Sequence, residues 1–256
     1  AAESQIYNLI TNHHIGGVVL LAKNDNFYVP DQAASNTAAQ ALNLTRRLQE
    51  IYWDASQTAR TDFTTGEKWT PQYIPLLIGI SQEGDGYPND QVLNGLTPLP
   101  NAMALGATWN PELAAQVGSI AGAELSALGV NLLFGPSLDV LETAQLEWVS
   151  TLGTRTFGGD PYWVSEMGRA YIRGVHQGSQ NKVAIVAKHF PGHGSSDRLP
   201  EEEVATVRKS LEQLKSFELA PFFAVTGNAS APEEVTDALL TSHIRYQGLQ
   251  GNIRAT

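Results

Sequence analysis

Apolar residues form short blocks along the chain, and longer stretches between them carry an apolar residue at every third or fourth position. A short apolar block rich in β-branched residues predicts a buried strand of the kind found in parallel sheets. Five such blocks occur, at residues 15–22, 75–80, 130–134, 183–187 and 238–243. The pattern therefore predicts five strands that alternate with helices.

The clearest helical segment begins at Asn110. An Asn there can cap the helix, Pro111 suits its first turn, and Glu112 faces the positive end of the helix dipole. Apolar residues continue at helical spacing until Gly129, which is a typical helix terminator. Further helices are predicted at residues 3–11, 31–59, 162–176 and 211–219.

Alternating strands and helices predict an α/β fold with a parallel sheet and helices outside it. A complete TIM-type (β/α)8 barrel needs about 250 residues, and the 256 residues present would suffice. Only five strands can be placed, so either three are hidden or the chain is part of a barrel. An open arc would leave two exposed edges, and we therefore expect the remaining strands elsewhere in the protein. With no repeat or linker in view, residues 1–256 are interpreted as a single, partial domain.

Charge and composition exclude several classes of function. The net charge of -10 leaves no basic surplus for binding nucleic acid. The absence of cysteine excludes disulfides and a thiol nucleophile. No apolar run is long enough to span a membrane. The sequence has no G-x-G-x-x-G fingerprint, so no phosphate-binding loop for a cofactor is predicted. No signal peptide is visible, and localisation in the cytoplasm, in the periplasm or outside the cell stays open.

Polar clusters follow four of the predicted strands, at residues 81–86, 137–139, 188–193 and 242–243. Loops are polar in any case, but the carboxyl ends of barrel strands share one face, where active sites form. Four clusters on one predicted face favour a functional site. The cluster after residue 187 is the most distinctive, since a cation and two imidazoles there need partners to offset their desolvation.

Arg155, Lys188 and His189 are the strongest candidates for binding a ligand. A planar, permanently charged donor and a point cation beside a titratable ring suit a ligand rich in hydroxyls or carboxylates. The alternative is structural ion pairing with Asp139 or Asp160.

Metal binding and serine chemistry are weaker hypotheses. His189 and His193 are four residues apart, which suits two metal ligands on a helix, but Pro191 and Gly192 between them disfavour a helix. No third ligand is evident, so no metal is expected, and His193 is interpreted as a turn residue. Ser195 follows this turn without the G-x-S-x-G motif of a nucleophile elbow.

The segment from Lys188 to Gly194, with the sequence KHFPGHG, resembles the signature of family 3 glycoside hydrolases in the version typical of bacterial β-N-acetylhexosaminidases. Other segments resemble the family in the same order along nearly the whole chain: 15–20, 82–84, 102–108, 155–161, 218–222 and 241–244. The resemblance implies a (β/α)8-type barrel whose first strand precedes Ala1 and whose last strands follow Thr256. It also implies that Arg155, Lys188 and His189 hold hydroxyls of the non-reducing sugar.

The resemblance further implies a retaining mechanism, in which a carboxylate nucleophile forms a glycosyl-enzyme that water then hydrolyses. The family nucleophile is an Asp expected downstream of Thr256. The hexosaminidase branch takes its acid/base from an Asp-x-His dyad, but here Glu201 stands where that His would be, and Asp197 is the alternative. Glu201 would need its pKa raised from about 4.3 towards roughly 6, which partial burial can supply. Ser81 also replaces a sugar-binding Asp of the family.

These inferences predict a hydrolase that removes non-reducing β-linked N-acetylglucosamine and needs the remainder of its own barrel for activity. Two alternatives stay open. One is a β-glucosidase-like member of the same family. The other is a non-catalytic carbohydrate-binding relative, which the missing Asp-x-His dyad and Ser81 would fit.

Overall fold

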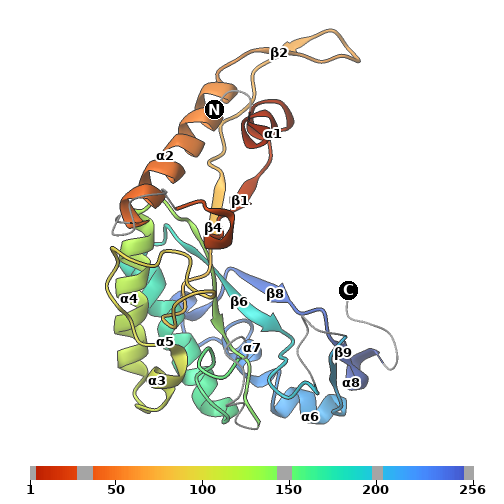
Figure 1. Ribbon diagram of the computed structural model, residues 1–256. Coiled ribbons are helices and arrows are strands. Elements are labelled where there is room, and N and C mark those ends of the chain that lie inside the picture. The colour runs from red at the N-terminus through yellow and green to blue at the C-terminus, as the bar shows by residue number, and fades with distance from the viewer. Residues whose placement is uncertain (1–3, 28–36, 143–151, 198–203, 251–256) are drawn as a thin grey trace.

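The computed structural model describes residues 4–27, 37–142, 152–197 and 204–250, and its centre is a parallel sheet of five strands (Figure 1). The strands are β1 (Gly17–Val19), β4 (Leu77–Ile80), β5 (Leu132–Ser137), β6 (Ala184–Phe190) and β8 (Ala238–Thr241), paired in that order. All five predicted strands are confirmed. Together they form an open arc of a TIM-type α/β barrel, as expected.

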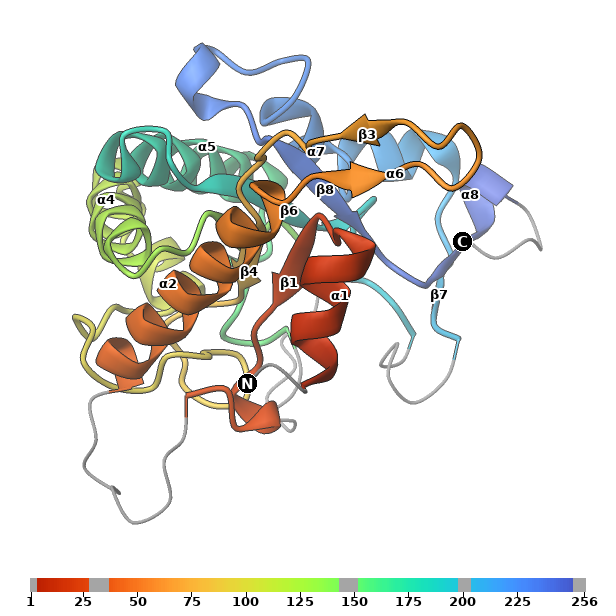
Figure 2. The same ribbon diagram turned by 90° about the horizontal axis from the view of Figure 1, so that it is seen from above.

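Helices α2, α4 and α5 lie on the same side of this sheet (Figure 2). The helices are α1 (Gln5–His13), α2 (Thr37–Ser56), α3 (Ala102–Gly106), α4 (Pro111–Ala127), α5 (Pro161–Ser179), α6 (Leu211–Ser216), α7 (Ala220–Ala224) and α8 (Gln247–Gln250). Two 3-10 turns are η1 (Ala22–Asn24) and η2 (Pro232–Glu234). Within the described residues, no helix is long and apolar enough to cross a membrane.

The predicted cap of α4 is confirmed, and α5 has a cap that was not predicted. Asn110 accepts a hydrogen bond from the backbone N–H of Glu112 at the start of α4, and Asp160 caps α5 in the same way. The helix predicted at residues 211–219 is present but shorter than expected, because α6 ends at Ser216, and a separate helix, α7, begins at Ala220. Pro221 lacks an N–H and cannot continue the preceding helix, which accounts for the break.

Glycines allow α4 and α5 to pack closely. A Cβ atom built on Gly174 would lie only 2.0 Å from the carbonyl oxygen of Ala115, and one on Gly122 only 2.4 Å from that of Val175. The two helices therefore meet backbone to backbone behind the sheet.

The two faces of the sheet differ in burial. Ile78 of β4 faces the helices and is fully buried, whereas Leu77 of the same strand is 49% exposed and Val19 of β1 is 52% exposed. Successive side chains of a strand point to opposite faces, so the face away from the helices is open. The first two strands were expected to be buried on both faces. They are buried on one face only, because helices pack against one face of the sheet.

Two short strand pairs were not predicted. β2 (Arg60–Thr61) and β3 (Lys68–Trp69) form an antiparallel hairpin, and β7 (Thr206–Val207) pairs in parallel with β9 (Arg245–Tyr246). Two residues are too few to show the alternation that marks a strand in a sequence.

Candidate active site

The predicted polar clusters lie at the carboxyl ends of β4, β5, β6 and β8. β6 is longer than expected and runs on to Phe190, so Lys188 and His189 belong to the strand itself. The pairing register shifts between Phe134 and Gly135 of β5, and again between Lys188 and Phe190 of β6. Such bulges change the direction of nearby side chains, and they occur next to active sites.

The loop after β4 is organised by Asp90. Its carboxylate accepts hydrogen bonds from the backbone N–H groups of Glu83, Gly84 and Gly86. Gly84 and Gly86 have φ angles of 81° and 80°, which residues with a Cβ atom rarely adopt. The loop is thereby fixed in a shape that places Glu83 next to the strands.

Glu83 is bound by both candidate cations. Arg155 donates from Nε to Oε2 at 2.6 Å and from Nη2 to Oε1 at 3.0 Å. Lys188 donates from Nζ to Oε1 of Glu83 and, at 3.0 Å, to the carbonyl oxygen of Phe134. Only 7% of the Glu83 side chain and 3% of the Lys188 side chain are exposed. One buried carboxylate is therefore shared by two cations.

This burial is reflected in the pKa values. Burial raises the pKa of Glu83, but Lys188 and Arg155 outweigh it and hold that pKa below its ordinary value. Burial lowers the pKa of Lys188, which Glu83 only partly offsets. Asp85, on the same loop, has a raised pKa because of burial and the neighbouring charge of Glu83.

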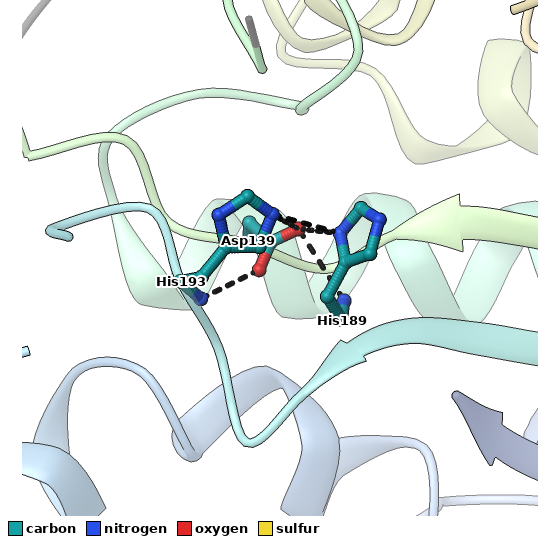
Figure 3. A group of neighbouring side chains, drawn as sticks. All are labelled: Asp139, His189 and His193. Carbon is teal, nitrogen blue, oxygen red and sulfur yellow. Dashed lines mark hydrogen bonds and ion pairs between the residues drawn. The ribbon is translucent and has the colours of Figure 1, made fainter. Parts of the chain in front are cut away.

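A second cluster consists of Asp139, His189 and His193 (Figure 3). The carboxylate of Asp139 is completely buried, and its Oδ2 lies 2.7 Å from Nδ1 of His189. Its Oδ1 accepts from the backbone N–H of His193 at 2.8 Å, and Nε2 of His193 lies 3.1 Å from Nδ1 of His189. Burial alone would raise the pKa of Asp139, but His193 and His189 hold it well below its ordinary range.

The structure resolves the open question about ion pairing. Arg155 and Lys188 form ion pairs with Glu83, while Nδ1 of His189 is hydrogen-bonded to Asp139, one of the two partners considered. Asp160 instead caps α5. The interpretation of His193 as a turn residue was incomplete, because its ring is buried against His189.

Of the two acid/base candidates, Asp197 lies within the described residues. Asp197 accepts from the backbone N–H of Thr206 at 2.8 Å and from Arg208 at 3.4 Å. Glu201 lies outside the described residues. The hydroxyl of Ser195 donates a hydrogen bond to the carboxylate of Glu218. This is a structural contact.

Asp139 is a third group near His189 and His193 that has the chemistry of a metal ligand, and the sequence did not suggest it. Its carboxylate and the ring nitrogens of His189 and His193 offer three ligand atoms within 4.8 Å of one another. Hydrogen bonds already join the same atoms, an arrangement that holds together without an ion.

A cavity of about 250 Å³ adjoins the Glu83 cluster on the helical side of the sheet. Glu83 and Arg155 contribute polar atoms to it, while Leu105, Phe157 and Tyr171 line it with apolar surface. Burial raises the pKa of the Tyr171 hydroxyl, which is therefore neutral in this setting.

An arc of parallel strands with buried, ionised side chains gathered at its carboxyl ends is the arrangement of an active site in a (β/α)8-barrel enzyme. Residues 1–256 match the family described as the glycosyl hydrolase family 3 N terminal domain, and the chain belongs to this family.

Known relatives agree with this assignment. The chain is 32% identical over 178 residues to a β-hexosaminidase of Thiobacillus denitrificans, and 28% identical over 251 residues to β-hexosaminidase A of Pseudoalteromonas piscicida. The matches cover 67% and 97% of this chain, but the chain spans only 45% and 36% of those relatives. A solved family 3 β-N-acetylglucosaminidase from Paenibacillus sp. str. FPU-7 is 31% identical with a TM-score of 0.75, covering 96% of this chain and 39% of that one.

Proposed function

We propose that the protein is a retaining glycoside hydrolase that removes β-linked N-acetylglucosamine from non-reducing ends. The observation that carries this proposal is the gathering of Arg155, Lys188 and His189 at the carboxyl edge of the sheet. Similar proteins named β-hexosaminidase and β-N-acetylglucosaminidase support it. Residues 1–256 would be one partial barrel domain that works with the remainder of the protein.

Both cations keep donors for a ligand. The bonds from Arg155 to Glu83 use Nε and Nη2, and no acceptor among the described residues meets Nη1. The Nζ of Lys188 has three donors, of which two are directed at Glu83 and Phe134. The remaining donors suit hydroxyl oxygens of a sugar, and the bonds to Glu83 hold them in fixed positions.

The carboxyl groups that would cleave the glycosidic bond are also part of this proposal. The nucleophile would be an Asp downstream of Thr256, and the acid/base either Glu201 or Asp197.

The test uses the full-length protein and 4-nitrophenyl N-acetyl-β-D-glucosaminide. Lys188→Ala should lower kcat/KM about tenfold or more, which corresponds to about 1.4 kcal/mol of transition-state stabilisation. Lys182→Ala is the matched control, because Lys182 is exposed and precedes β6 at the opposite end of the strand, and it should leave the rate unchanged.

A parallel assay on the corresponding β-glucoside separates the glucosidase alternative. Folded protein that binds N-acetylglucosamine without hydrolysing any aryl β-glycoside would reject the proposal in favour of a carbohydrate-binding relative.

A further inference from the structure

The ring of His189 has two different sides. Its Nδ1 is enclosed by Oδ2 of Asp139 at 2.7 Å and by Nε2 of His193 at 3.1 Å (Figure 3). No group among the described residues bonds to its Nε2, and 19% of the side chain is exposed. The ring is thus held by one nitrogen and presents the other.

The group facing Nδ1 decides which nitrogen carries the hydrogen. An ionised carboxylate can only accept, so a bond of 2.7 Å to Asp139 requires a hydrogen on Nδ1. The same hydrogen lies towards Nε2 of His193, which can accept it as a second partner. A neutral imidazole has a single ring hydrogen, and Nε2 of His189 is then left with a lone pair.

Asp139 is fixed in place by contacts of its own. Its Oδ2 accepts from the hydroxyl of Ser137 at 2.7 Å, and its Oδ1 accepts from the backbone N–H of His193. Its carbonyl oxygen accepts from the hydroxyl of Thr156. With no exposed surface and these donors around it, the carboxylate cannot turn away from His189.

We propose that Asp139 and His193 are positioning residues that hold His189 with its hydrogen on Nδ1, so that Nε2 recognises a sugar hydroxyl by accepting its hydrogen. The proposal rests on the proposed function for the identity of the ligand. Arg155 and Lys188 can only donate, so the site demands that one hydroxyl donates while others accept. A fluorine in place of the donating hydroxyl would accept but not donate, and the site would reject it.

The tautomer is measured directly by ¹⁵N NMR of histidine side chains in the labelled full-length protein, at about pH 8 to keep a free imidazole neutral. His189 should show a protonated Nδ1 and an unprotonated Nε2. In Asp139→Asn the new amide can donate to Nδ1, and the hydrogen should move to Nε2. His176 is the internal control, since it bonds to Glu233 and Asp237 elsewhere and should not change.

Ligand selection is measured by calorimetric titration with N-acetylglucosamine and its analogues fluorinated at C3, C4 or C6. At one of these positions the fluoro analogue should bind about tenfold more weakly than the parent sugar, and the deoxy analogue equally weakly. In Asp139→Asn, His189 becomes a donor, and the penalty for fluorine should shrink or reverse while that for the deoxy analogue persists.

Three results would overturn the proposal: a hydrogen on Nε2 of His189 in the native protein, an unchanged tautomer in Asp139→Asn, or equal binding of all fluoro analogues. The native spectrum and the native titrations decide the matter even if the variant does not fold. Because the NMR measurement needs neither substrate nor turnover, a protein without hydrolase activity would refute the proposed function and leave the tautomer result standing.

Discussion

Glu83→Gln should destabilise the protein strongly, because Glu83 is the shared anion of two buried cations. The native cluster of Glu83, Arg155 and Lys188 has one excess positive charge, and the substitution raises the excess to two. Removing one partner of a buried ion pair costs about 3–5 kcal/mol. In a domain of this size such a loss lowers the melting temperature by roughly 6–20 °C.

The same reasoning predicts a ranking of variants. Lys188→Met leaves Glu83 paired with Arg155 and no excess charge, so it should cost less than Glu83→Gln. The double variant should recover part of the loss, since one cation rather than two remains without its anion. Glu50→Gln is the control for a lost carboxylate: Glu50 and Arg46 are 55% and 75% exposed, and such a pair contributes about 0.3–0.5 kcal/mol.

The assay is urea unfolding of the four variants, followed by circular dichroism at neutral pH, with free energies compared at equal m-values. A cost for Glu83→Gln no larger than that for Glu50→Gln would show that the cluster is not desolvated. A cost smaller than that for Lys188→Met would refute the charge count on which the ranking depends.

Three further predictions address other parts of the structure. The pKa of Asp139 is lower in the folded protein than in the unfolded chain. The ionised carboxylate therefore stabilises the fold fully above the unfolded pKa of about 3.9, and this contribution is lost as the pH falls. Acid should thus reduce the unfolding free energy of the native protein more than that of Asp139→Asn. Gly174→Ala should cost about 1–3 kcal/mol by forcing α4 and α5 apart, whereas Gly227→Ala, with nothing within 4 Å of the new Cβ, should be neutral in thermal denaturation. In steady-state assays Glu201→Gln should lower kcat about 100-fold, and a larger loss in Asp197→Asn would exchange their roles.

The fold was accessible from the sequence because its signals are local. The β-branched run at residues 183–187 marked β6, and Asn110 with Pro111 marked the start of α4. The end of α6 at Ser216 was placed three residues too late, and the short helix α7 was not predicted.

The site was only half accessible. Lys188 and His189 stood out because charged groups at the end of a buried strand are unusual. Of the partners, Asp139 was considered but Glu83 was not. Glu83 precedes Lys188 by 105 positions and Asp139 precedes His189 by 50, so these pairs depend on sheet register, which no local pattern reveals. An acid just beyond each of β4 and β5 was the available signal.

Asp90 has a thermodynamic consequence for ligand binding. Its carboxylate satisfies three backbone N–H groups of the loop after β4, so this loop is ordered before any ligand binds. Fixing the backbone of one residue costs about 1–2 kcal/mol in conformational entropy. For this loop the entropy is lost when the protein folds and not when a ligand binds. Binding at Arg155, which Glu83 holds in place, should therefore proceed as docking to a preorganised surface, with most of the contact free energy expressed as affinity.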